Sequence, residues 1–157
     1  MGGEMTSDLA IKLAYELIEE AKVDLQAARE LLKQKFFHKA VFESQQCVEK
    51  AMKATLACEG LTQVYEHDVG ALFAAEVITH APQDWVEELR NVFRETAWLM
   101  EQYTATRYPA IKARTVVSPR KSYREDEAKD AIKTAELALN TIEKYVQQMT
   151  GKRNKST

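Results

Sequence analysis

The stretch SDLAIKLAYELIEEAKVDLQAARELLK, residues 7–33, decides the fold class of this chain. Its small and apolar residues recur at alternating steps of three and four, which is the repeat of one face of an α-helix. Ser7 or Asp8 stands where a helix N-cap belongs. We therefore predict a long first helix with one buried stripe. The stripe consists of Ala14, Leu17, Ala21, Leu25, Ala28 and Leu32.

The same periodicity predicts four more helices, over residues 38–59, 68–80, 82–103 and 123–148. Gly60 is expected to end the second helix, and Asp68 to cap the third. Ala81-Pro82 separates the third helix from the fourth. No sustained period-two run indicates a strand. The sequence thus predicts an all-α, antiparallel, up-and-down bundle of about five helices.

One domain accounts for the length and composition of the chain. Its 157 residues are 45% hydrophobic and include only five Gly and three Pro, which suits a single compact core. We expect one helical domain over residues 1–157, with its core at about residues 7–150 and fraying at 1–6 and 151–157.

Cysteine spacing and hydropathy bear on cofactors and compartment. Cys47 and Cys58 lie eleven residues apart in one predicted helix, roughly 16 Å along its axis, which is too far for a disulfide. Neither zinc-type spacing nor paired Glu-x-x-His motifs occur, so we predict no metal and no cofactor. Residues 1–8 are short and polar, and no later window approaches the roughly 18 apolar residues of a membrane span. We expect a cytoplasmic protein that does not enter a membrane.

The strongest charge feature lies between the fourth and fifth predicted helices. Residues 103–124 contain six cations and no Asp or Glu, although the whole chain has a formal net charge of −2. Three tyrosines are interleaved with these cations, so base stacking could accompany phosphate binding. The alternative is a solvated loop whose cations pair with acidic helix faces. Residues 104–122 are expected to form a long structureless link, which is often functional. The six cations are Arg107, Lys112, Arg114, Arg120, Lys121 and Arg124.

Two motifs within these elements are similar to a known family. The run QQCVEKAMKA at residues 45–54 and the tetrapeptide TRYP at residues 106–109 resemble the HEPN family of prokaryotic helical domains. The resemblance extends over nearly the whole chain. It also includes Asp24-Leu25, Ala28, Leu31-Leu32, Ala40 to Phe42, His67, Tyr123 and Ala128.

The resemblance implies a helical bundle that commonly forms a homodimer and often acts with a small nucleotidyltransferase, sometimes as a toxin–antitoxin pair. Active ribonucleases of the family carry Arg, four to six residues and then His. No arginine here precedes a histidine at that spacing, because Lys112, Ala113 and Arg114 stand five to seven places after Arg107. We therefore predict no catalytic residue, and a chain that is not an enzyme on its own.

Together these observations predict a site that binds a nucleotide or RNA through its phosphates. Its cations would be Arg107, Arg114 and Arg120, with Tyr108 packed or stacked beside them. The adjoining groove would be lined by Lys50, Lys53 and His67. Alternatively, these lysines are ordinary surface residues, with Lys53 paired to Glu49. His67 could likewise make only a structural contact.

Three functions therefore remain open from the sequence. The first is a nucleotide- or RNA-phosphate-binding module that acts with a nucleotidyltransferase. The second is a degenerate ribonuclease toxin that uses Arg107 and a basic neighbour. The third is a purely structural partner that docks a nucleotidyltransferase.

Overall fold

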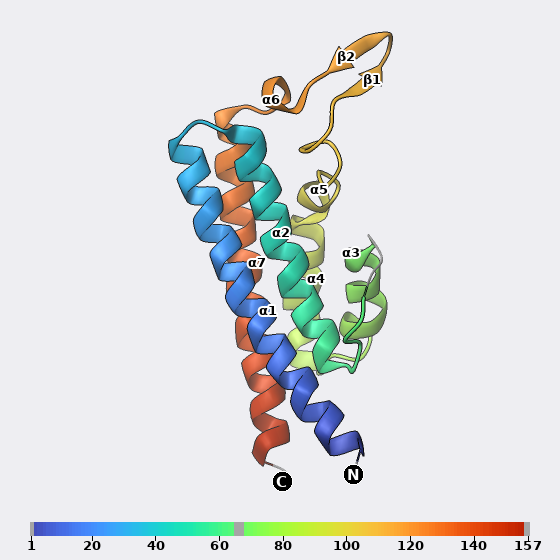
Figure 1. Ribbon diagram of the computed structural model, residues 1–157. Helices are drawn as coiled ribbons and strands as arrows, with labels where there is room; N and C mark the ends of the chain where they lie inside the picture. Colours follow the sequence, from blue (N-terminus) through green and yellow to red (C-terminus); the bar gives the residue numbers. More distant parts are fainter. Residues whose placement is uncertain (1, 65–67, 156–157) are drawn as a thin grey trace.

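Three long helices form the body of the molecule. The computed structural model describes residues 2–64 and 68–155. Helices α1 (Gly2–Lys33), α2 (Phe37–Cys58) and α7 (Glu125–Lys155) lie side by side, and α2 packs against both of the others (Figure 1). α1 begins and α7 ends at the same end of this body (Figure 1). The predicted all-α bundle is confirmed.

Helix α2 ends as its sequence predicts. Gly60 adopts φ 86°, in the left-handed region that favours glycine. Its N–H donates to Ala57 O, and Leu61 N–H donates to Leu56 O, which is the Schellman pattern of a helix C-terminus. The chain can therefore turn away from the body at this residue.

A second layer of shorter helices packs on the body. It consists of α3 (Val69–Leu72), the π-helical turn η1 (Phe73–Ile78), α4 (Gln83–Glu95) and α5 (Ala97–Met100). The Asp68 carboxylate accepts a hydrogen bond from Ala71 N, so the predicted cap is confirmed. The single helix predicted over residues 82–103 is wrong, because the helix is interrupted at Thr96. Thr96 is buried, and its hydroxyl donates to Val92 O at 2.7 Å.

The predicted structureless link is a β-hairpin followed by a short helix. β1 (Ala110–Lys112) and β2 (Thr115–Val117) pair antiparallel, and α6 (Pro119–Ser122) follows. Ala113 and Arg114 form the two-residue turn, with φ 49° and 65°. The hairpin projects from the end of the bundle opposite the start of α1 (Figure 1).

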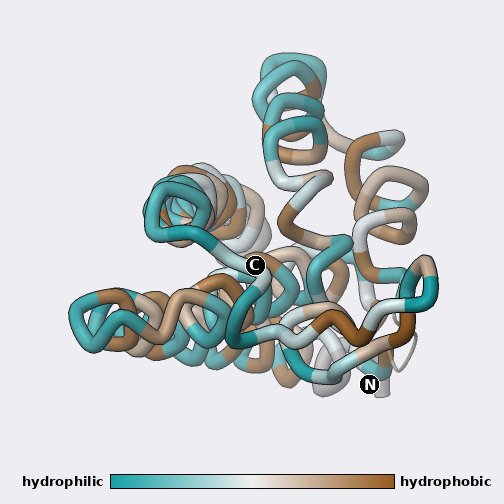
Figure 2. Tube along the Cα trace, turned by 90° about the horizontal axis from the view of Figure 1, so that it is seen from above, coloured by the Kyte–Doolittle hydropathy of each residue, from teal (hydrophilic) through white to brown (hydrophobic). Residues whose placement is uncertain are grey.

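Apolar stripes of α1 and α7 face the core. Ala14, Ala21 and Ala28 of the predicted α1 stripe are fully buried. On α7, the buried stripe includes Ala128, Ala135, Ile142 and Val146. Hydrophilic and hydrophobic residues alternate every few positions along the tubes, as amphipathic helices require (Figure 2). Cys47 and Cys58 are both buried. Within the described ranges, no helix combines the length and the apolar character that a bilayer crossing needs.

Candidate functional site

Arg107 lies in a nest of aromatic rings at the base of the hairpin. Its guanidinium carbon is 3.9 Å from the centroid of the Tyr103 ring, 4.9 Å from that of Tyr108 and 5.9 Å from that of Phe42. Its Nε donates to Tyr103 O at 3.1 Å. Phe42 belongs to α2 and packs against Tyr103, with ring centroids 6.4 Å apart. These contacts hold the guanidinium in one orientation and join the hairpin base to the bundle.

The TRYP motif has a distinct structural task at each position. Thr106 is buried, and its hydroxyl donates to Gln102 O at 2.8 Å. Arg107 stacks on the rings, whereas Tyr108 remains 57% exposed. Pro109 then leads into β1, where its fixed φ and missing N–H suit an extended entry. The motif therefore turns the chain from the bundle into the hairpin.

Four other cations of the basic segment lie on the hairpin and on α6. Lys112 ends β1, Arg114 occupies the turn, and Arg120 and Lys121 lie in α6. All four side chains are exposed. None of them, nor Arg107, forms an ion pair with an acidic side chain in the part of the chain that the structure describes. The basic segment therefore keeps most of its charge unneutralised.

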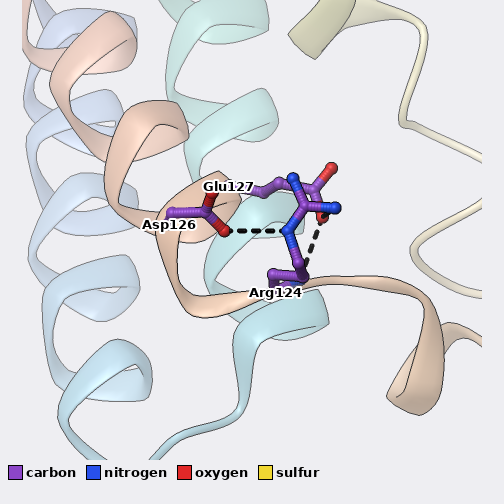
Figure 3. Close-up of polar contacts among 3 residues, drawn as sticks. All are labelled: Arg124, Asp126 and Glu127. Carbon is purple, nitrogen blue, oxygen red and sulfur yellow. Dashed lines mark hydrogen bonds and ion pairs between the residues drawn. The ribbon is translucent and has the colours of Figure 1, made fainter.

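Arg124 is the exception, because it pairs with acidic side chains, which is the alternative considered for the basic segment. Its Nε donates to Asp126 Oδ1 at 3.1 Å, and its Nη1 lies 3.9 Å from Glu127 Oε1 (Figure 3). Glu127 Oε1 also accepts the backbone N–H of Arg124 at 3.0 Å. The hydrogen bond to Asp126 raises the pKa of Arg124 and lowers that of Asp126. Arg124 thus pairs with the acidic first turn of α7.

A cavity of about 220 Å³ lies between α5, the hairpin and the start of α7. Trp98, Tyr108 and Tyr123 line it together with Lys112 and Glu127. The Trp98 side chain is 43% exposed. Trp98 is distant from the hairpin along the chain, so the sequence alone did not predict that it lines this cavity.

A family model described as HEPN domain matches residues 14–145. The chain belongs to the HEPN family. It is 32% identical over 146 residues to the protein named "Putative toxin MJ1304" of Methanocaldococcus jannaschii, which covers 92% of this chain and 95% of that protein.

Two solved structures share the fold of this HEPN chain. One is ST0689, described as an archaeal HEPN homologue, with a TM-score of 0.63 and 28% identity over 85% of this chain and 97% of that one. The other is TT1696 from Thermus thermophilus, with a TM-score of 0.63 and 26% identity over 83% of this chain and 96% of that one. The family predicted from the two sequence motifs is confirmed.

Lys50 of this HEPN domain is engaged at the interface of α1 and α2. Its Nζ lies 2.7 Å from Asp24 Oδ2, and the Asp24 side chain is only 11% exposed. No donor among the described residues is directed at Oδ2 with hydrogen-bond geometry, so we treat the contact as an ion pair. Burial, followed by the nearby Asp24 charge, raises the pKa of Glu43 beside this pair. Lys50 therefore has a local acidic partner.

Lys53 faces a different part of the HEPN domain. It lines a cavity of about 210 Å³ with Leu13 and Leu17 of α1 and with residues 61–64. Neither this cavity nor the Lys50–Asp24 contact includes a residue of the hairpin. His67 lies outside the described residues. The structure thus brings Arg107 and Tyr108 together, and it places Lys50 and Lys53 in separate environments.

Proposed function

We propose that this HEPN domain binds the phosphates of a nucleotide or an RNA strand through Arg107, Arg114 and Arg120. The observation that carries the proposal is the setting of Arg107. Its guanidinium is held against Tyr103 and has no acidic partner among the described side chains. The hydrogen bond to Tyr103 O uses Nε, which leaves the two Nη groups as donors for a phosphate.

The hairpin supports the proposal through its charge and its geometry. Lys112, Arg114, Arg120 and Lys121 are exposed, so their cations repel one another until an anion screens them. Arg114 has φ 65°, a conformation that costs a non-glycine residue roughly 1–2 kcal/mol. Strain of this kind is concentrated at functional sites. An arginine at the tip of a projecting hairpin is well placed to meet a phosphate backbone.

In this proposal the domain acts with partners that the family resemblance implies. These are a second copy of the chain and a small nucleotidyltransferase. The domain would bind the ligand without cleaving it, because the three positions at which the family's histidine could stand after Arg107 hold Lys112, Ala113 and Arg114. The lysines at positions 50 and 53 would contribute to the bundle more than to the ligand.

Calorimetric titration with hexa-adenylate RNA, ATP and GTP at two salt concentrations tests the proposal. Replacing Arg107 or Arg114 by Ala should weaken binding and lower the salt slope by about one per lost phosphate contact. Arg94→Ala is the matched control, because Arg94 is an exposed arginine on α4 that pairs with Glu87. Unchanged affinity in folded Arg107→Ala and Arg114→Ala proteins would contradict phosphate binding at the hairpin.

A degenerate ribonuclease toxin is the second candidate, and the similarity to the protein named "Putative toxin MJ1304" favours it. In this case expression of the chain should arrest growth and cleave cellular RNA, and Arg107→Ala should relieve both effects. Growth at the normal rate with intact RNA would rule out this candidate. The binding proposal would be unaffected.

A further inference from the structure

The cavity beside the hairpin has the size of a small group rather than of a whole ligand. Its volume of about 220 Å³ lies below the roughly 300–1,000 Å³ of pockets that enclose drug-sized molecules. Parts of α5, both strands and the first turn of α7 contribute to its lining. A single planar ring system would fit this space, with the rest of the ligand outside.

Three aromatic side chains are part of the lining of this cavity, which also contains polar residues. Trp98 and Tyr108 are 43% and 57% exposed, so both retain ring surface that no part of the bundle covers. Tyr123 packs edge-on against Trp98, with ring centroids 6.5 Å apart and an interplanar angle of 69°. The Tyr123 hydroxyl donates to Gln102 Oε1 at 2.7 Å, which fixes its ring. Exposed rings in a fixed frame are typical of platforms on which nucleobases stack.

The charges around the cavity separate the place of a base from that of a phosphate. Glu127 is in the lining, and a carboxylate there repels a phosphate but can accept a hydrogen bond from a base amino group. Lys112 lies on the hairpin side of the lining, next along the chain to the turn that carries Arg114. Phosphate is therefore favoured outside the cavity, towards the hairpin.

Tyr108 connects the cavity to the proposed phosphate site. Its ring lines the cavity, and its centroid is 4.9 Å from the guanidinium carbon of Arg107. A base in the cavity and a phosphate at Arg107 would thus lie on adjacent groups of one protein segment. This arrangement matches a ligand in which a base and a phosphate are joined by one sugar.

We propose that the Trp98–Tyr108–Tyr123 cavity receives one unstacked nucleobase, with Trp98 as its main stacking surface. The inference rests on the proposed phosphate-binding function and adds a base-specific contact to it. The base belongs either to a single strand or to a free nucleotide, and these two sources share the same chemistry in the cavity. Duplex RNA, whose bases are stacked and paired, would be excluded from it.

Fluorescence of Trp98 tests this inference directly. The chain has two tryptophans, and Trp85 packs against Tyr145 at a centroid distance of 5.4 Å, away from the cavity lining. The Trp85→Phe protein therefore reports on Trp98 alone. We expect hexa-adenylate RNA to change this fluorescence, whereas an abasic hexamer with the same phosphates should bind, by calorimetry, without changing it.

Affinity measurements give a second and independent readout. Trp98→Leu should weaken hexa-adenylate binding on the order of tenfold and leave the affinity for the abasic hexamer unchanged. Phe93→Leu is the control, because Phe93 is an aromatic residue of α4 with similar exposure, 39%, outside this cavity. AMP at comparable concentration distinguishes the sources: a fluorescence change with AMP identifies a free nucleotide, and a change with the hexamer alone identifies a strand.

The outcomes separate this inference from the function on which it rests. Equal affinity for the abasic and the normal hexamer, with no effect of Trp98→Leu, would overturn the base cavity and leave phosphate binding intact. Failure of both hexamers and of AMP, ATP and GTP to bind at low salt would overturn phosphate binding, and the base cavity with it. Base-dependent affinity that is lost in Trp98→Leu establishes both.

Discussion

Replacing Lys50 by Met distinguishes a structural lysine from a ligand-binding one. The substitution keeps the apolar stem of the side chain and removes the ammonium that lies 2.7 Å from Asp24 Oδ2. The Asp24 side chain is 11% exposed, so its carboxylate would remain in the interface of α1 and α2 without its cation. We expect a loss of stability and no loss of affinity for RNA.

The expected loss follows from the burial of the pair. Breaking a fully buried ion pair by removing one partner costs about 3–5 kcal/mol. The Lys50 side chain is 29% exposed, and solvent screening reduces this figure to about 2–3 kcal/mol. In a domain of this size, each kcal/mol lowers Tm by about 2–4 °C, so Lys50→Met should lower Tm by about 5–10 °C.

Urea unfolding followed by circular dichroism measures the effect. The control is Lys39→Met on the same helix, because Lys39 is exposed and forms no ion pair with a described residue. The double variant Asp24→Leu with Lys50→Met should recover most of the lost stability, since both charges are then gone. Unaltered stability of Lys50→Met, together with weaker RNA binding, would refute the structural assignment.

Three further predictions follow from the structure. Burial raises the pKa of Glu43, so its ionised form lowers the stability of the protein above that pKa. Glu43→Gln should therefore stabilise the protein at pH 7.5, and this gain should vanish near pH 4. An equal gain at both pH values in urea unfolding would contradict this. Burial raises the pKa of Cys47 to about 12. In a Cys58→Ser variant at pH 8, the Cys47 thiol should therefore react with a disulfide reagent on the order of a thousandfold more slowly in the folded protein than in guanidinium. Rapid labelling of the folded variant would contradict this prediction. Ala113→Asn should slow amide exchange in the hairpin about two- to fivefold, because Asn tolerates φ 49°, and faster exchange would disprove the strained turn.

The helices were predictable because the spacing of apolar residues along the sequence follows from which helix face is buried. The alternating stripe of α1 and the stop at Gly60 each need only local information, and both are confirmed. The break at Thr96 was hidden because this residue lies on the buried stripe and leaves the pattern continuous. The Thr96 hydroxyl donates to the carbonyl of Val92, but Ser44 makes the same bond to Ala40 O inside the uninterrupted helix α2, so this bond alone does not account for the break.

The hairpin escaped prediction for a different reason. Its strands have three residues each, too few to establish a period of two. Its turn also lacks the Asn-Gly or Asp-Gly signal of a two-residue hairpin, because Ala113 and Arg114 occupy the positions with positive φ. The sequence of this segment therefore could not be distinguished from that of an irregular link.

The site was predictable as a charge pattern but not as a set of contacts. Counting cations identified the basic segment, yet it could not show that Arg124 pairs with Asp126 two residues later while Arg107 stacks on rings. The partner of Lys50 is Asp24, on another helix, and only the fold brings these two residues together. Charge composition thus locates a basic surface, whereas the availability of each cation depends on tertiary structure.

The energetics of the hairpin connect its exposure with its proposed use. Ile111 and Val116 face each other across the strands, yet they are 79% and 69% exposed, so little apolar burial stabilises the pair. A two-stranded hairpin is marginally stable alone, and the turn adds strain. Its stability must therefore come from the base, where Arg107 and Tyr123 contact the bundle side. An anion bound at that base would tighten the same contacts, so ligand binding should protect the hairpin amides from exchange more than those of α1.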